Sequence, residues 1–191
     1  KEQEVLNNLK RIGHIELPEV TPIAAAPEAY FYRNKMEFSF SDSRWLTPEE
    51  IQEKDTIEDR NALGFHIPGM WDKILDIKKC HLQADPSNEM RLFVKRFAIA
   101  EGITFFNPRN HTGELRTLMI RTSSKGEYMV LIQFCENNEF NRIKLLEAIK
   151  NQFPSITSLQ YVINQKANDT IYDQEVICFS GRDHIIEEME G

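Results

Sequence analysis

Two apolar segments near the middle of the chain, Leu115–Ser123 and Glu127–Cys135, limit the fold more than any other feature. Only Ser124-Lys125-Gly126 separates them, and a short connection that contains glycine is typical of a β-hairpin. Both segments carry apolar side chains at odd and at even positions. Since a strand with one face in water alternates apolar and polar residues, this hairpin is expected at the centre of a sheet that is covered on both sides.

The rest of the chain supplies helices and further strands. Helical spacing of apolar residues and terminal signals predict helices over 1–11, from Asp85-Pro86 to Gly102, and over 139–152, with a short surface helix from Thr47. Alternation predicts strands over 30–40, 63–67, 73–78, 158–164 and 174–180, with 185–189 as an optional last strand. Without strict βαβ alternation, this order predicts an α+β fold in which about three helices pack on a mainly antiparallel sheet.

The composition and the cysteines exclude several classes of protein. No run approaches the ~18 to 20 apolar residues of a membrane span, and the first residues lack the apolar core of a secretory signal, so a soluble, cytoplasmic protein without a membrane partner is expected. Cys80, Cys135 and Cys178 lack the spacing of a disulfide framework or a zinc site. Cys135 and Cys178 fall within apolar strands and are expected to be packing residues.

Two cations share one face of the expected first strand. With a period of two, Arg33 and Lys35 lie opposite the apolar face, where they can bracket a phosphate, and a merely solvated strand face is the equally weighted alternative. Arg116 and Arg121 are five residues apart and are expected on opposite faces of their strand. At most one of them can therefore join Arg33 and Lys35.

Signatures of common enzymes are absent from the sequence. It contains no G-x-G-x-x-G, Walker, H-E-x-x-H or G-x-S-x-G motif, so the residues alone name no reaction. Cys80 follows two lysines, a basic setting that suits a reactive or metal-ligating thiolate, although an inert thiol at a strand end is the commoner case.

Several short motifs follow one another in a specific order. They are Tyr32–Phe40 (YRNKMEFSF), Leu63–His66 (LGFH), Leu75–Cys80 (LDIKKC), Gly113–Arg116 (GELR), Phe153–Ser158 (FPSITS), the pair Ile163-Asn164 and the stretch 181–191. In this order they resemble the RNA (uracil-5-)-methyltransferases, above all the branch that acts on 23S ribosomal RNA. The resemblance covers essentially the whole chain.

The resemblance implies that residues 1–191 form the central, RNA-binding-type domain of a larger enzyme. Members of the family usually carry an N-terminal oligonucleotide-binding-type domain with a cysteine-rich segment, and a C-terminal S-adenosylmethionine-binding domain that holds the catalytic cysteine and base. The start at Lys1 and the end at Gly191 fit an excised piece. We therefore expect a catalytically silent chain that helps to cradle RNA, with a monomer as the expected state.

The same resemblance gives roles to individual residues. Arg33 and Lys35 match the basic run of the family's first central strand, which faces RNA, although Glu37 makes this run less basic. Arg116 matches the G-x-L-R element and is the next candidate for an RNA contact. Cys80 matches the fourth ligand of a [4Fe–4S] cluster, whose other three cysteines would precede Lys1, so it is expected to be an orphan ligand with a free thiol.

The leading hypothesis is thus a fragment of an S-adenosylmethionine-dependent 23S rRNA uridine C5-methyltransferase. A non-enzymatic protein-interaction domain with an acidic surface and no RNA role is the alternative, and a redox or metal role for Cys80 alone is a third. The first two hypotheses differ in how they interpret the net charge of the chain.

The formal net charge of −7 by itself disfavours a nucleic-acid partner. However, the acids are concentrated: Asp42–Arg60 holds seven acids and three bases, and Asp173–Gly191 holds six acids and one base. The remaining residues are slightly basic in sum. The net charge therefore predicts weak RNA binding by this chain alone and says little about a longer protein.

Overall fold

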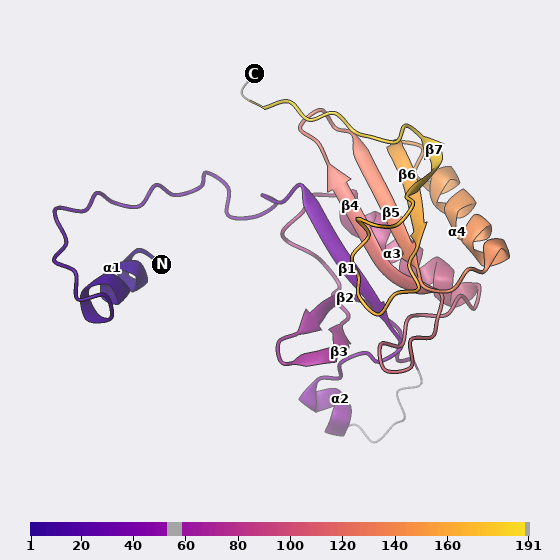
Figure 1. Ribbon diagram of the computed structural model, residues 1–191, viewed down its shortest axis with the longest axis horizontal. Helices are drawn as coiled ribbons and strands as arrows, with labels where there is room; N and C mark the ends of the chain where they lie inside the picture. Colours follow the sequence, from indigo (N-terminus) through magenta and orange to yellow (C-terminus); the bar gives the residue numbers. More distant parts are fainter. Residues whose placement is uncertain (53–58, 190–191) are drawn as a thin grey trace.

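The computed structural model describes residues 1–52 and 59–189, and within these ranges seven strands form one sheet (Figure 1). The strands are β1 (Lys35–Ser41), β2 (Ala62–Ile67), β3 (Met70–Leu75), β4 (Leu115–Thr122), β5 (Tyr128–Phe134), β6 (Ile156–Ile163) and β7 (Ile177–Gly181). The helices are α1 (Glu2–Arg11), α2 (Pro48–Gln52), α3 (Ser87–Ala100) and α4 (Glu139–Gln152). None of them is long and apolar enough to cross a membrane.

The strand order across the sheet is β3-β2-β1-β4-β5-β6-β7. Neighbouring strands are antiparallel except β5 and β6, which run parallel because α4 forms the crossover between them. The α+β class is confirmed, and the sheet is mixed, with one parallel pair. The β4–β5 hairpin lies at its centre, where Leu118 faces Ile132 and Ile120 faces Val130, as predicted.

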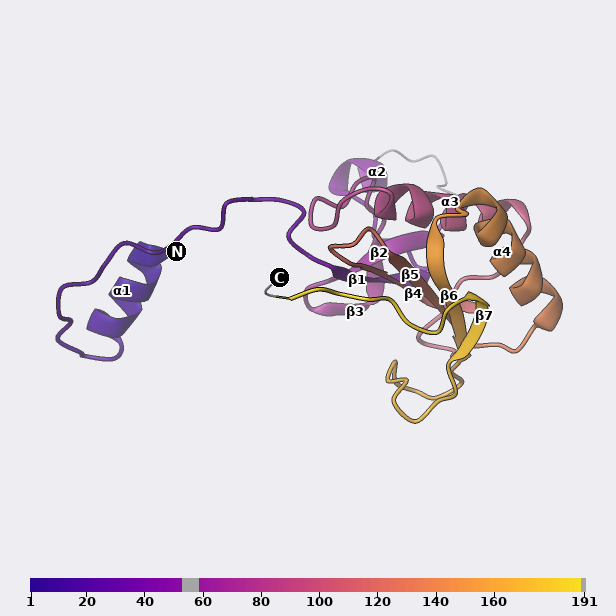
Figure 2. The ribbon, with the colours of Figure 1, turned by 90° about the horizontal axis from the view of Figure 1, so that it is seen from above.

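One face of the sheet packs against α3 and α4, as Figure 2 shows from above. Phe38, Leu118 and Ile132 from the strands are fully buried against Val94 of α3 and Leu146 of α4. Most of the apolar residues whose spacing predicted these two helices face the sheet, but Ile143 of α4 is 44% exposed. Of the three long helices predicted, two pack on the sheet, whereas α1 buries none of its residues and lies apart.

The opposite face, called here the helix-free face, has a much smaller apolar cluster. Met119, Leu131 and Val162 are buried there, and Ile171 of the β6–β7 connection (164–176) packs on them. Figure 2 shows this connection on the side of the sheet away from α3 and α4. The hairpin is covered on both faces, as predicted, but its second cover is a loop rather than a helix.

Two predicted strand segments lie outside the sheet. The strand expected over 30–40 begins only at Lys35, and before it Phe31 and Arg33 donate backbone N–H groups to the carbonyls of His81 and Leu82. The optional strand over 185–189 is an extended segment without a ladder partner in the described structure. Part of the expected acidic stretch, 53–58, lies outside the described residues.

The segment 182–187 is fastened to the tip of the β4–β5 hairpin through Glu127. Arg182 contacts the Glu127 carboxylate at 2.5 Å, and the backbone N–H of Ile186 donates to it at 2.7 Å. These hydrogen bonds, the backbone one above all, hold the pKa of Glu127 below its usual range. At neutral pH the carboxylate is therefore charged and keeps this segment along the hairpin.

A buried arginine connects α3 to the edge of the sheet. Arg91 has no exposed surface, and its guanidinium donates to the carbonyl oxygens of Leu63 at 3.0 Å and Lys78 at 3.2 Å. The guanidinium also lies 5.5 Å from the ring centroid of Phe38. Burial lowers the pKa of Arg91, because the charged guanidinium is removed from water.

We predict that Arg91→Ala lowers the free energy of unfolding by about 2–4 kcal/mol, because it removes the hydrogen bonds to the buried Leu63 carbonyl and the partly buried Lys78 carbonyl and opens a cavity. Denaturant unfolding measures this loss. Arg96→Ala, an exposed position on the same helix, is the control and should change stability by less than ~0.5 kcal/mol. Equal stability of the two variants would show that the Arg91 contacts contribute little.

Candidate functional site

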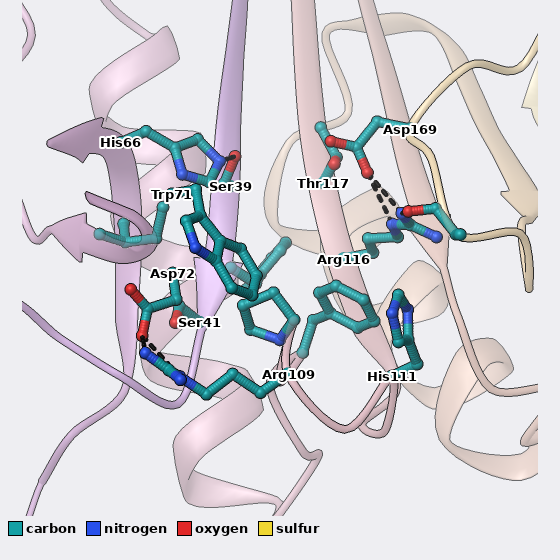
Figure 3. Close-up of a pocket in the computed structure, with 15 residues that line it drawn as sticks. Ser39, Ser41, His66, Trp71, Asp72, Arg109, His111, Arg116, Thr117 and Asp169 are labelled. Carbon is teal, nitrogen blue, oxygen red and sulfur yellow. Dashed lines mark hydrogen bonds and ion pairs between the residues drawn. The ribbon is translucent and has the colours of Figure 1, made fainter. Parts of the chain in front are cut away.

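A pocket of about 440 Å³ opens where β1 ends and β4 begins. Its wall is built from strands β1 to β4, from the loop 106–113 and from the β6–β7 connection. Figure 3 shows Trp71 at its centre, with Ser39 and His66 on one side and the Asp72–Arg109 pair on the other. Segments distant in sequence therefore meet here, which is the usual situation for a binding site.

Trp71 is the most unusual residue of the pocket because its large apolar ring is 61% exposed. The guanidinium carbon of Arg109 lies 5.6 Å from the indole centroid, a cation–π contact that steadies both side chains. Two nitrogens of the same guanidinium contact one carboxylate oxygen, Oδ2 of Asp72, at 2.8 Å from Nε and 2.7 Å from Nη2. An aromatic plane and a cation thus stand side by side.

The charge of this corner is positive. Hydrogen bonding from Arg109, with the nearby Lys73 ammonium at 3.7 Å, holds the pKa of Asp72 below its usual range. Asp72 is therefore a carboxylate at neutral pH, but it is shared by two cations. In a chain with a net charge of −7, this corner therefore has a local excess of positive charge.

The other wall of the pocket is polar. Ser39 Oγ lies 3.2 Å from Nε2 of His66, and Thr117 of β4 lies on the same side. Hydroxyl groups and imidazole both donate and accept hydrogen bonds. The pocket therefore combines an aromatic surface, a cation and groups that can pair with the polar edge of a planar ligand.

Arg116 forms the floor between the pocket and the β6–β7 connection, and it is only 3% exposed. It donates to Asp169 Oδ1 and to the carbonyls of Asn164, Lys166 and Ala167, at distances of 2.6–3.3 Å. Its guanidinium also covers the Phe106 ring at 4.7 Å. Since these contacts engage its donors, we infer that Arg116 holds the connection in place.

A bulge in β4 explains why the alternation rule failed for this arginine. The pairing with β5 shifts between Leu115 and Thr117, so that Leu115 stays in the core while Arg116 turns to the helix-free side. Arg116 and Arg121 therefore share a side of the sheet, contrary to the expectation of opposite faces.

A second hollow, of about 890 Å³, continues along the helix-free face. Asp169 lines both hollows, which are therefore neighbours. Lys35 and Arg121 are directly paired across β1 and β4 in this groove, and Tyr172 at its border is 98% exposed. Glu37 takes part of the Lys35 charge, at 2.6 Å from its ammonium.

The structure does not gather the predicted site residues into one cluster. Lys35 lies in the groove, Arg116 lies under the pocket, and Arg33 lies in the segment before β1. Their contacts with RNA stay predictions. Trp71 and Arg109 were not predicted as site residues. The one available signal was the aromatic residue Trp71 at the exposed end of a hairpin.

Cys80 has a free thiol, as predicted, and it is buried with 3% of its surface exposed. Asn88 brackets its backbone, accepting from the Cys80 N–H at 2.7 Å and donating to its carbonyl at 3.0 Å. Cys135 is buried as expected, whereas Cys178 is exposed, so the packing role predicted for Cys178 is wrong because it points outward from the edge strand β7.

The residues present do not form an iron–sulfur site. A [4Fe–4S] cluster needs four ligands, and Cys80 is the one residue of this chain that the resemblance assigns to it. In the described ranges no three histidine, cysteine, aspartate or glutamate side chains converge as metal ligands. The cluster expected from the resemblance therefore has no support in this chain.

Known proteins resemble this chain over its whole length. It is 52% identical over 196 residues to a protein of Porphyromonas gingivalis and 50% identical over 194 residues to one of Bacteroides thetaiotaomicron, each named an uncharacterized RNA methyltransferase. Both alignments include 100% of this chain but only 42% and 43% of the relatives. No family model matches the chain.

A solved structure has the same fold. The tRNA (uracil-54, C5)-methyltransferase of Pyrococcus abyssi, crystallised with S-adenosyl-L-homocysteine, superposes with a TM-score of 0.63 over 95% of this chain and 38% of its own, at 24% sequence identity.

The relatives are named RNA methyltransferases and the solved structure has the same fold, so the resemblance of the motifs to RNA methyltransferases is confirmed. This particular chain aligns along its whole length and spans about two fifths of the length of these relatives.

We predict that Arg116→Gln loosens the β6–β7 connection without unfolding the sheet. The backbone N–H groups of Lys166 and Thr170 should exchange with solvent deuterium about 10- to 100-fold faster, because the loop loses its charged anchor, while amides of β5 keep their rates. Hydrogen exchange followed by mass spectrometry measures both regions. Arg121→Ala, an exposed change on the same strand, is the control, and equal exchange in the two variants would refute the anchoring role.

Proposed function

We propose that this chain is the RNA-binding part of an S-adenosylmethionine-dependent RNA (uracil-5-)-methyltransferase, and that it is catalytically silent alone. One observation carries the proposal: cations and exposed aromatic rings share the helix-free face of a chain whose relatives are named RNA methyltransferases. Unpaired RNA is bound by surfaces of this kind, where bases stack on rings and phosphates meet cations.

The surface has a definite layout. Arg109 lines the pocket, and Lys73 lies beside it, next to Asp72. The groove contains Lys35 and Arg121, so cations lie at both ends of the face. We expect the RNA backbone to follow this line, with Arg33 near its end. Arg116 contributes to RNA binding indirectly, because it holds the β6–β7 connection in place.

The finer assignment rests on the resemblance of the motifs and on the solved relative, which acts on a uracil of tRNA. We propose uridine C5 as the methylated atom and 23S rRNA as the substrate, with tRNA as the competing substrate class. S-adenosylmethionine, the catalytic cysteine and the general base are assigned to parts of the longer protein outside this chain. The protein is proposed to act as a monomer in the cytoplasm.

We predict that a protein of the relatives' length that contains this chain transfers labelled methyl groups from S-adenosylmethionine to uridines of 23S rRNA. The 191-residue chain should transfer none, because no catalytic cysteine and base are assigned to it. Methyl transfer by the isolated chain would disprove its silence. Failure of the folded longer protein to methylate either rRNA or tRNA would disprove the proposed activity.

We predict weak, salt-dependent binding of single-stranded RNA by the isolated chain. Lys35→Ala and Arg33→Ala should each reduce the slope of log affinity against log salt by roughly 0.7, since each loses one phosphate contact. Fluorescence anisotropy with a labelled oligonucleotide measures the slope. Lys150→Ala, on α4 at the other side of the sheet, is the control. If RNA fails to bind even at low salt, the acidic protein-interaction domain becomes the better description.

A further inference from the structure

The pocket around Trp71 is built differently from the groove beside it. The groove is an open hollow along the strands, whereas the pocket places one large ring, the Asp72–Arg109 ion pair and a polar wall around a single hollow. Its volume of about 440 Å³ lies toward the small end of the range for ligand pockets. It is therefore a site for one small planar group rather than for a length of backbone.

We propose that this pocket captures one unpaired base of the RNA, a base held for anchoring rather than for chemistry. This inference rests on the proposed function. The base stacks on the exposed part of the Trp71 ring, while Arg109 and Lys73 lie near the phosphate that precedes or follows it.

The contacts of Arg109 prepare the site for such a ligand. The guanidinium lies against the indole and is held by Asp72, which is only 6% exposed, so both the ring and the cation are already oriented. Binding of a base to side chains that are already oriented costs less free energy, because the protein has less to order. Two cations share one carboxylate, so the pocket mouth has a net positive charge. It therefore attracts a phosphate rather than a cation.

The polar wall fits the edge of a base. Ser39, His66 and Thr117 offer both donors and acceptors, and the Watson–Crick edge of every base presents the same two kinds of group. A flat apolar side chain of a partner protein would cover these groups without offering them a hydrogen bond. The chemistry of the wall therefore favours a base.

Trp71 fluorescence reports this binding directly. The chain has two tryptophans, so Trp45→Phe leaves Trp71 as the single indole emitter. This variant is titrated with a single-stranded RNA heptamer of mixed sequence and, in parallel, with a heptamer of abasic ribose phosphates. Saturable quenching by the first and none by the second is expected, because only a base can stack on the ring.

Substitutions test the same contact through affinity. Trp71→Ala should weaken binding of the RNA heptamer about 5- to 100-fold, and Trp71→Phe should restore most of it. Phe140→Ala removes an aromatic ring that is even more exposed (75% against 61% for Trp71) from α4, on the other side of the sheet, and should leave affinity unchanged. Circular dichroism of each variant shows that the sheet is intact.

The outcomes separate this inference from the proposed function. If the RNA heptamer binds with the expected salt dependence, but Trp71→Ala binds as well as the parent or the abasic heptamer quenches equally, then the pocket holds no base and RNA binding by the groove stands. If neither heptamer binds at low salt, the proposed function and this inference fail together.

Discussion

Burial of one side of the sheet under α3 and α4 is the interaction on which the rest of the molecule depends. Phe38, Leu118 and Ile132 are removed from water there together with the apolar faces of both helices, and each such side chain contributes roughly 1.5–3 kcal/mol. On the other side, the described residues form a cluster of three buried apolar side chains. Because stability comes from the covered side, the helix-free face is left to carry polar, charged and aromatic residues.

The helix-free face is organised by hydrogen bonds instead of apolar packing. Arg116 ties four positions of the β6–β7 connection to β4, and Asn164 at the start of that connection donates to Gln133 and accepts from Lys166. A loop held in this way has a defined shape without covering the face. The groove and the pocket can then lie on either side of Asp169.

The sequence predicted those elements whose signals are local. The bounds of α4 agree with the prediction, since Asn138 caps its first turn by accepting from the Asn141 N–H and Phe153-Pro154 follows its end. The Thr47–Glu50 capping box is likewise present in both directions. Two motif glycines have a structural reason, because a Cβ atom at Gly64 or Gly113 would meet a backbone oxygen at about 2 Å.

Features that depend on a distant partner were missed. Residues 30–34 have the alternation of a strand, but the ladder between β1 and β4 begins only at Lys35 and Arg121, and the backbone before it bonds to the non-strand segment 81–82. The bulge beside Arg116 exists because of the register with β5. Trp71 and Arg109 are 38 positions apart, and no local rule brings them together.

The two edges of the sheet also have a consequence for the molecule as a whole. β3 and β7 are short, with six and five residues, and each pairs with its neighbour through an irregular register. Short, kinked edges are poor templates for a strand from another molecule. The protein can therefore expose the large rings of Trp71 and Tyr172 for recognition. Its edge strands meanwhile offer a second copy few regularly spaced backbone groups with which to extend the sheet.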